Sequence, residues 1–291
     1  MKRETCPACG NVLATGIRSW HLVCKCCGYE GSSLEPDIGA NAGSNGIDEG
    51  AREHALSALR HRNFLLIATQ VTGMVPQNRI GVRPRLLDVG CAHGWFMQAC
   101  SANFDVVGIE PDRVVAEATR KRVGPIRQGF FPDVLQADEK FDVVAFNDVL
   151  EHIPDVRSAM LACQHHLSPG GLLVINAPCR KGCLYRFAKF MARCGWERSF
   201  ERMWQLGLPS PHVHYFDARS ISRLGREVGL EVVKQTSLPS VVVSGLYSRI
   251  WCSRQMSRTK AAVIAGSVLL MMPILNVLPS DIEVWYLRKA E

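Results

Sequence analysis

The sequence lacks the features that mark secreted, disordered or repetitive chains. Met1-Lys2-Arg3 runs directly into polar sequence, without the apolar segment that signal peptides contain. We therefore expect a cytoplasmic protein, in which the 12 cysteines are thiols or metal ligands instead of disulfides. There is no internal repeat, and a chain of 291 residues that is 47% hydrophobic and only 21% charged is neither disordered nor fibrous.

Acidic side chains are scarce in one part of the chain, and this accounts for the net charge of +7. Residues 1–179 carry 17 basic and 19 acidic side chains (−2), residues 180–260 carry 15 and 5 (+10), and residues 261–291 carry 2 and 3 (−1). The basic segment also contains apolar stretches. This combination favours an anionic membrane surface or an anionic acceptor over nucleic acid as the partner.

Five of the cysteines lie within the first 27 residues. Two CxxC pairs, each followed by glycine, are separated by fourteen residues, and they comprise Cys6, Cys9, Cys24 and Cys27. This spacing is typical of a zinc ribbon, in which two knuckles supply four thiolates to one structural Zn²⁺. The alternative is a set of packed thiols. Cys26 is a surplus thiol, and His21 is a possible substitute ligand. We expect a ribbon over residues 1–30 and a linker over 31–50, which is rich in turn-forming residues.

Short apolar runs alternate with helical patterns in the rest of the chain, which predicts an α/β domain over residues 51–291. Strands joined by helices need crossover connections, and these give a parallel sheet with helices on both faces. Ligands of such sheets bind at the carboxyl ends of the strands. The main strands are predicted at 85–89, 105–109, 126–128, 141–146 and 172–175, and the helices at 51–72, 95–102, 113–122 and 156–167.

Two of these strand ends carry residues typical of a site for a nucleoside-containing cofactor. The first strand runs into the turn Asp88-Val89-Gly90-Cys91-Ala92-His93-Gly94, whose glycines permit close approach of a ligand to the backbone. Glu110 ends the second strand twenty residues after Gly90. Its carboxylate is placed to accept hydrogen bonds from two ribose hydroxyls.

These motifs, with Gly108-Ile109-Glu110-Pro111, Phe141-Asp142-Val143-Val144, the segment DVLEHIPD at 148–155 and Leu167-Ser168-Pro169-Gly170-Gly171, resemble those of class I S-adenosylmethionine-dependent methyltransferases. The resemblance is strongest to the branch that contains ubiquinone-biosynthesis O-methyltransferases, and it covers residues 51–236 and the last strand. It implies a Rossmann-like fold with a seven-stranded, mostly parallel sheet, and S-adenosylmethionine (SAM) as cofactor.

The resemblance also implies roles for individual residues. Family members usually have glycine where this chain has Ala92, which restricts the backbone there. The methionine-side pocket is expected to contain Asp88, Gly90 and Gly94, the ribose to be held by Glu110, the adenine to be flanked by Phe130, Phe131 and Asp133, and the sulfonium to lie near Asn147.

Two patterns that would indicate other chemistry are missing. A dinucleotide site needs the turn G-x-G-x-x-G/A, but this chain has Ala92 and Trp95 at the third and sixth positions. Methyltransferases that act on amino groups of bases commonly carry an Asn/Asp-Pro-Pro-aromatic turn after the fourth strand, where this chain has Asn147-Asp148-Val149-Leu150. These absences disfavour NAD binding and adenine or cytosine N-methylation.

A hydroxyl acceptor needs a group that takes its proton, and neutral histidine suits this role. His152 follows the fourth strand beside the cofactor, and His212 and His214 follow the fifth strand on the acceptor side. We predict His152 and His214 as the catalytic pair. In the ubiquinone branch the Glu-His region is also associated with metal, while a purely structural hydrogen bond of His152 is the alternative.

Two insertions are predicted to form the acceptor region. Residues 180–214 contain a basic amphipathic helix at the lid position, with Leu184, Phe187, Ala188 and Met191 on one face. Residues 237–280 separate the last two strands and contain the apolar run 261–278, flanked by Arg249, Arg254, Arg258 and Lys260. We expect this run to dip into one leaflet or lie in the interface of a membrane, or else to pack on the domain or a second copy of the chain.

The sequence thus predicts a SAM-dependent methyltransferase of a hydroxyl group in a small-molecule, lipid-linked or glycan acceptor, with docking at the inner face of a membrane. The first alternative is an rRNA methyltransferase that uses the zinc ribbon to recognise RNA. The second is a non-catalytic adaptor that retains the SAM fold.

Overall fold

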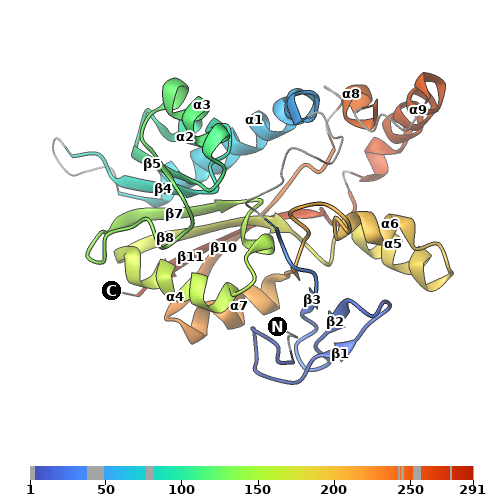
Figure 1. Ribbon diagram of the computed structural model, residues 1–291, viewed down its shortest axis with the longest axis horizontal. Helices are drawn as coiled ribbons and strands as arrows, with labels where there is room; N and C mark the ends of the chain where they lie inside the picture. The colour runs from blue at the N-terminus through green and yellow to red at the C-terminus, as the bar shows by residue number, and fades with distance from the viewer. Residues whose placement is uncertain are drawn as a thin grey trace.

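The computed structural model describes residues 4–37, 49–76, 82–241, 243, 246–251, 257–275 and 277–290, and its side chains from residue 57 in the first long helix (Figure 1). A seven-stranded sheet has the strand order β10-β11-β8-β7-β4-β5-β6. All strands are parallel except β11, which is antiparallel to both neighbours. The predicted α/β fold is confirmed. The strands are β4 (Arg85–Val89), β5 (Asp105–Glu110), β6 (Ile126–Gln128), β7 (Phe141–Asn147), β8 (Leu167–Pro178), β10 (Leu230–Leu238) and β11 (Ile282–Lys289).

Alternating side chains of the strands pack against helices on opposite faces of the sheet, because successive residues of a strand point to opposite sides. Leu86 lies in a buried cluster with apolar residues of the first helices, whereas Leu87 lies in a second cluster with residues of later helices. Figure 1 shows the two layers above and below the sheet. One layer consists of α1 (Glu49–Met74), α2 (Trp95–Cys100) and α3 (Arg113–Val123), and the other of α4 (Val156–His166) and α7 (Ala218–Glu227).

The amino-terminal residues form a second, small sheet that includes a strand from the acceptor region. β1 (Ala14–Thr15), β2 (His21–Val23) and β3 (Glu30–Ser32) are antiparallel, and β3 also pairs with β9 (His214–Tyr215). The predicted linker therefore begins too early, since its first residues belong to β3 and the Asp37 N–H donates to the Pro209 carbonyl at 2.8 Å. Residues 38–48 of that linker lie outside the described residues.

The segment 180–214, predicted to be a lid and named the lid below, contains the expected helix, but the buried face of this helix shares only Ala188 with the predicted apolar face. α5 (Cys183–Arg193) buries Tyr185, Ala188 and Ala192 and leaves Phe187 and Phe190 about 60% exposed. The physical reason is that Tyr185 stacks on Tyr215 of β9, with ring centroids 4.1 Å apart, and donates its hydroxyl to Glu30. α6 (Arg198–Met203) completes the lid.

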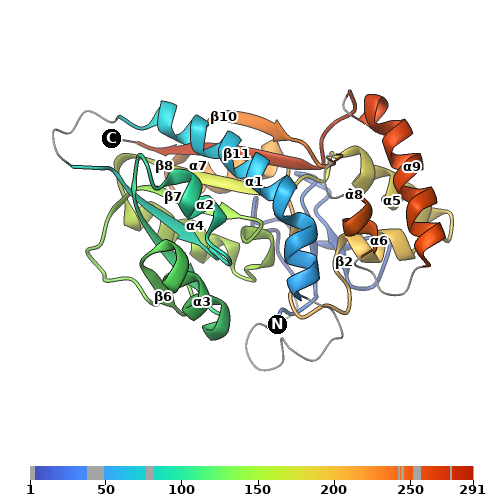
Figure 2. The ribbon, with the colours of Figure 1, turned by 90° about the horizontal axis from the view of Figure 1, so that it is seen from above.

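The second insertion forms α8 (Leu246–Trp251) and α9 (Arg258–Leu275), and α9 continues through Pro273. α9 is long and apolar enough to cross a membrane by length and composition, and only 11% of it is buried. The predicted flanking residue Arg254 lies outside the described residues, as does the side chain of Arg249. Figure 2 shows α9, α8 and the lid helices at the same end of the molecule.

Candidate active site

The turn between β4 and α2 holds three residues in left-handed backbone conformations. Gly90 and Gly94 have φ of 69°, and Ala92 has φ of 42°. A Cβ atom on Gly90 would lie 2.5 Å from Cγ2 of Val149, and one on Gly94 would lie 2.9 Å from side chains of α3. Gly90 thus lets the loop after β7 approach the turn, whereas Gly94 is required by the packing of α2 on α3.

Ala92 is strained, since a left-handed conformation costs an L-residue roughly 1–2 kcal/mol. We expect Ala92→Gly to leave the free energy of unfolding unchanged or raise it by up to about 1 kcal/mol, because relief of strain exceeds the entropy that glycine gains in the unfolded chain. Urea denaturation measures this change, and a loss of more than 1 kcal/mol would show that the turn does not strain Ala92.

Glu110 lies at the end of β5 beside this turn, as predicted. Its carboxylate accepts the backbone N–H groups of Ala92 and Asp112, each at 2.9 Å. Burial raises its pKa above the ordinary value, although the two backbone hydrogen bonds act in the opposite direction. The turn and the carboxylate are therefore fixed to each other before a ligand binds.

Asp88 and Asn147 lie side by side on neighbouring strands. The side-chain Nδ2 of Asn147 donates to Asp88 at 3.2 Å, and the side-chain oxygen Oδ1 of Asn147 is buried without a hydrogen-bond partner. Burial, with a further contribution from the Glu110 charge, raises the pKa of Asp88 to about 7. A cationic ligand group would relieve this electrostatic cost, and the methionine ammonium of SAM is such a group.

The three residues predicted to flank the adenine differ in their surroundings. Gly129 donates its N–H to the Glu110 carbonyl at 3.1 Å, so Phe130 follows directly at the same edge of the sheet and is half exposed. Phe131 is partly buried with its ring edge-to-face against Phe146, and Asp133 is exposed. Phe130 therefore has an accessible ring, whereas the ring of Phe131 packs against Phe146.

A cluster of Glu151, His152 and His212 lies just beyond β7. The ligating atoms of the three side chains lie within 4.8 Å of one another, and the two imidazole centroids are 4.8 Å apart. His152 Nδ1 donates to the Pro211 carbonyl at 3.0 Å, so in the neutral ring Nε2 carries the lone pair. Nε2 lies 4.0 Å from the Glu151 carboxyl. This arrangement gives His152 a nitrogen that can accept a proton.

Burial controls the charge of the other two members. It raises the pKa of Glu151 well above the ordinary value, aided by the nearby Asp148 carboxylate. It lowers the pKa of His212 to about 3, aided by the positive charge of protonated His152. One oxygen of Glu151 and Nδ1 of His212 are buried without hydrogen-bond partners. A divalent cation would satisfy the Glu151 oxygen and ionise Glu151. The Gln205 amide nitrogen lies 2.8 Å from Nε2 of His212 and donates to it, so Nδ1 carries the ring proton; Nδ1 becomes a cation ligand when the Gln205 amide presents its oxygen to Nε2 instead.

His214 does not belong to this cluster, so its predicted role as a base is wrong. Its side chain is fully buried, Nε2 donates to the Ile153 carbonyl at 2.9 Å, and Nδ1 accepts the Tyr29 hydroxyl. Both ring nitrogens therefore serve the fold. His212, two residues earlier, lies against His152 instead. Sequence position alone does not show which of two alternating histidines faces His152.

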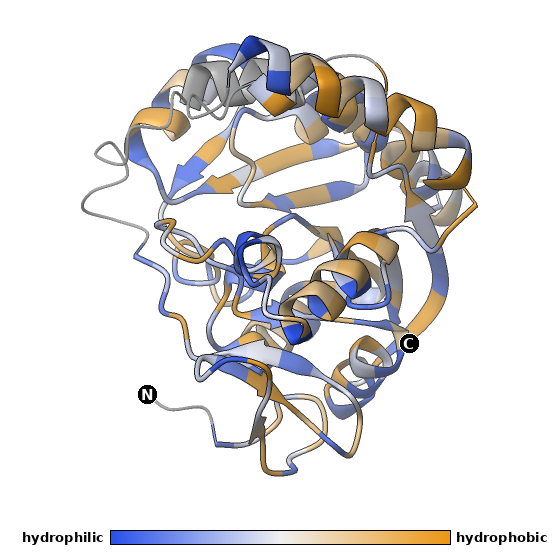
Figure 3. Ribbon diagram, turned by 90° about the vertical axis from the view of Figure 1, so that its right-hand side faces the viewer, coloured by the Kyte–Doolittle hydropathy of each residue, from blue (hydrophilic) through white to orange (hydrophobic). Residues whose placement is uncertain are grey.

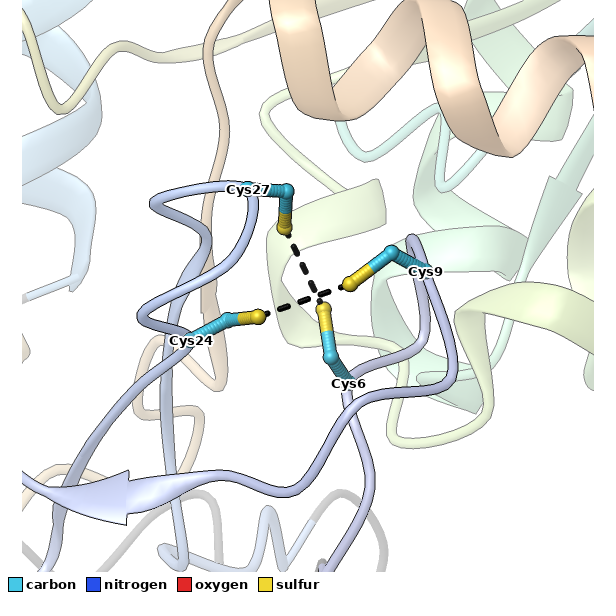
Figure 4. Close-up of side chains that lie close together, drawn as sticks. All are labelled: Cys6, Cys9, Cys24 and Cys27. Atoms are coloured by element: carbon cyan, nitrogen blue, oxygen red, sulfur yellow. Dashed lines mark hydrogen bonds between the residues drawn. The ribbon is translucent and has the colours of Figure 1, made fainter.

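The four predicted zinc ligands converge from two loops (Figure 4). Their sulfur atoms lie within 4.8 Å of one another, with Cys6 and Cys27 sulfurs 3.5 Å apart and Cys9 and Cys24 sulfurs 3.4 Å apart. Gly10 and Gly28 close the two knuckles in left-handed conformations. Tetrahedral zinc, with Zn–S bonds of about 2.3 Å, fits four sulfurs at this spacing. His21 instead bonds Glu30, and Cys26 is exposed.

Comparison with known proteins agrees with this geometry. Residues 50–235 match the family described as Methyltransferase domain. The chain is 30% identical to the ubiquinone biosynthesis O-methyltransferase of Azorhizobium caulinodans over 99 residues (32% of this chain, 39% of the relative), and 36% identical to that of Cereibacter sphaeroides over 99 residues (32% and 40%). It thus spans less than half the length of these two curated relatives.

A solved SAM-dependent methyltransferase from Thermotoga maritima shares the fold, with a TM-score of 0.53 and 17% sequence identity over 83% of this chain and 95% of that one. The family match covers strands β4 to β8, the first part of β10, the glycine turn, Glu110 and the Glu151-His152 pair, and it ends before β11. The chain belongs to the methyltransferase-domain family and has the class I Rossmann-like fold.

Proposed function

We propose that the chain transfers a methyl group from SAM to a hydroxyl group of an amphiphilic or lipid-linked acceptor at a membrane surface. The observation that carries the catalytic part is the position of the Glu151–His152–His212 cluster. It begins four residues after Asn147, which itself contacts Asp88 in the cofactor half of the site. A proton acceptor therefore lies beside the expected position of the sulfonium.

The sulfonium methyl is already activated, so this chain needs to align the acceptor and remove its proton. Asp88, Glu110 and Asn147 bind and orient the cofactor. His152 accepts the hydroxyl proton at Nε2, while its Nδ1–H bond to Pro211 fixes the ring. When Glu151, His152 Nε2 and His212 hold a divalent cation, His152 would be a ligand instead of the base, and the cation would lower the pKa of a bound hydroxyl.

The acceptor class is inferred from the exposed apolar surface at one end of the molecule. The exposed fraction is 84% for Leu270 and 58% for Ile274, both on α9, and Phe187 and Phe190 of α5 are similarly exposed. Figure 3 faces this end and shows hydrophobic residues along the helix at its upper edge. Arg258 and Lys260 begin α9. Apolar groups beside basic groups are typical of helices that lie in the interface of an anionic membrane.

A pocket of about 460 Å³ lies between α9 and the edge strands. The strand register connects this pocket with the proposed active site. Asn147 of β7 is paired with Asn176 of β8, which is paired with Val284 of β11. Val284 is in turn paired with Thr236 of β10, and the next residue, Ser237, lines the pocket. Three strand spacings amount to about 14 Å. An acceptor with its hydroxyl near His152 could therefore extend an apolar tail along this edge. Apolar lining residues include Leu184, Leu238, Met272, Leu275 and Leu278.

Transfer of labelled methyl from SAM tests the proposal. The protein is incubated with separate lipid, glycan, RNA and small-molecule extracts of its source cell, and we expect label in the lipid extract. Label in RNA, with binding that falls steeply with salt, would favour the rRNA alternative. Failure to bind SAM would favour the adaptor.

Flotation with liposomes tests the membrane contact. We expect the double substitution Leu270→Glu/Ile274→Glu to reduce binding to anionic liposomes at least tenfold. It removes two exposed apolar side chains and introduces two negative charges, which the anionic lipid repels. The matched control is Val114→Glu/Leu161→Glu, which alters exposed apolar residues on α3 and α4. Equal loss in both variants, or no loss in either, would contradict an α9 contact.

A further inference from the structure

The segment that carries His212 is held between two parts of the molecule. On one side, the Val213 N–H donates to the Glu151 carbonyl at 2.8 Å. On the other, the Val213 carbonyl accepts the Ser32 N–H at 3.1 Å, and the His212 carbonyl accepts the Ser32 hydroxyl at 2.9 Å. Residues 212–214 thus connect strand β3 of the amino-terminal cysteine module with the Glu151–His152 pair.

A second set of contacts repeats this connection one residue further on. His214 accepts the hydroxyl of Tyr29 and donates to the Ile153 carbonyl, and all of these groups are buried or partly buried. Tyr29 lies two residues after Cys27, and the Tyr29 carbonyl accepts the Cys24 N–H at 2.8 Å. The route from the cysteine cluster to the Glu151–His152 segment therefore consists of direct hydrogen bonds between buried or partly buried groups.

The adjacent residue Glu30 fixes the lid to the same strand. Its buried carboxylate accepts Tyr185 at 2.7 Å and Lys189 at 2.6 Å, both from α5, and it contacts His21 at 3.0 Å. These partners lower the pKa of Glu30 to about 2 despite its burial. The contacts described here reach the acceptor side of the protein, at residues 180–217, and none of them involves Asp88, Gly90 or Glu110.

We propose that the zinc ribbon is a positioning element of the active site. It holds His212 and the backbone of Val213 against Glu151–His152, and Ser32 and Tyr29 are the positioning residues. The proposal rests on the proposed role of the histidine cluster. It differs from a purely stabilising role because it predicts that loss of the ribbon contacts changes the acceptor half of the site and leaves SAM binding intact.

The test compares Ser32→Ala and Tyr29→Phe with Arg18→Ala. Arg18 also joins the ribbon to the lid, through Glu197 and Glu201, but it does not contact residues 212–214. Histidine ring signals are recorded by ¹⁵N NMR, and SAM affinity by calorimetry. We expect both positioning variants to shift the ring signals of His152 and His212 and to lower turnover at least fivefold, with the SAM Kd within twofold of wild type. Arg18→Ala should leave the ring signals unchanged.

Removal of zinc by a chelator gives an independent readout. The ring centroid of Trp204 in the lid lies 5.7 Å from that of Trp20 in the ribbon. Tryptophan fluorescence therefore reports a separation of the ribbon from the lid. The zinc-free protein should show altered fluorescence and histidine signals while it still binds SAM. Unchanged histidine signals in both positioning variants and in the zinc-free protein would overturn the proposal, as would equal shifts in Arg18→Ala. Failure of the unmodified, zinc-loaded protein to bind SAM would instead refute the proposed function.

Discussion

Replacement of His152 by glutamine is expected to lower the rate of methyl transfer by about 10²–10⁴-fold, the usual contribution of a positioned general base. Glutamine retains a donor for the Pro211 carbonyl but offers no nitrogen that can take a proton. SAM should bind with a Kd within twofold of wild type, because the proposed cofactor contacts lie at Asp88 and Glu110. Single-turnover transfer into the lipid extract and calorimetry measure the two effects.

His165→Gln is the matched control for this substitution. His165 is an exposed histidine of α4 whose Nε2 bonds the Ala137 carbonyl, and it lies outside the cluster. Its variant should keep wild-type turnover. If His152→Gln retained more than a third of the wild-type rate, or if it weakened SAM binding as much as turnover, His152 would be a structural residue and the base would have to be sought elsewhere.

The affinity for SAM is expected to fall as the pH is lowered through about 7. Burial raises the pKa of Asp88 from 3.8 to about 7, so below this pH the folded apo-protein holds a proton on Asp88. In the proposed complex the methionine ammonium pairs with the ionised carboxylate, so binding must release this proton. The Kd should therefore rise by up to tenfold for each pH unit between about 6.5 and 5. Glu110, whose pKa burial also raises, acts in the same direction.

Asp88→Asn provides the control, since asparagine can still accept the Asn147 amide but does not titrate. It should weaken SAM binding at pH 8 and flatten the pH dependence. Because folding raises the pKa of Asp88, protonated Asp88 contributes its full stabilisation of the native state only below pH 4, and this contribution is lost as the pH rises through 7. The substitution should therefore increase the free energy of unfolding of the apo-protein at pH 8 by at most about 4 kcal/mol. An unchanged pH slope would exclude Asp88 as the ammonium partner.

The fold was predictable because its signals are local. The central strands β4, β5, β7 and β8 contain short apolar runs, and the glycine turn with Glu110 twenty residues after Gly90 predicts the cofactor edge without any long-range information. The cysteine knuckles are equally local, since spacing and the following glycine suffice to bring four sulfurs together. These features were found where the sequence placed them.

The acceptor half was harder to predict because it depends on contacts between distant segments. The two-residue strand β9 has no pattern of its own and forms only because β3, some 180 residues earlier, pairs with it. That pairing buries His214 and turns His212 toward His152. The same pairing explains which face of α5 is buried. Tyr185 bonds Glu30 of β3 and stacks on Tyr215 of β9, and this orientation of the helix leaves Phe187 and Phe190 exposed. No periodicity within α5 reveals this choice.

Calorimetric titration of the protein with SAM tests the central claim most directly. We predict saturable binding with one site per chain, and an at least hundredfold weaker Kd in Glu110→Ala, whose folding is checked by its thermal melt. The carboxylate is expected to hold the ribose, and charge-assisted hydrogen bonds of this kind contribute about 1.5–3 kcal/mol each. Absence of saturable heat with the wild type, or equal affinity in Glu110→Ala, would contradict a SAM site at this edge of the sheet.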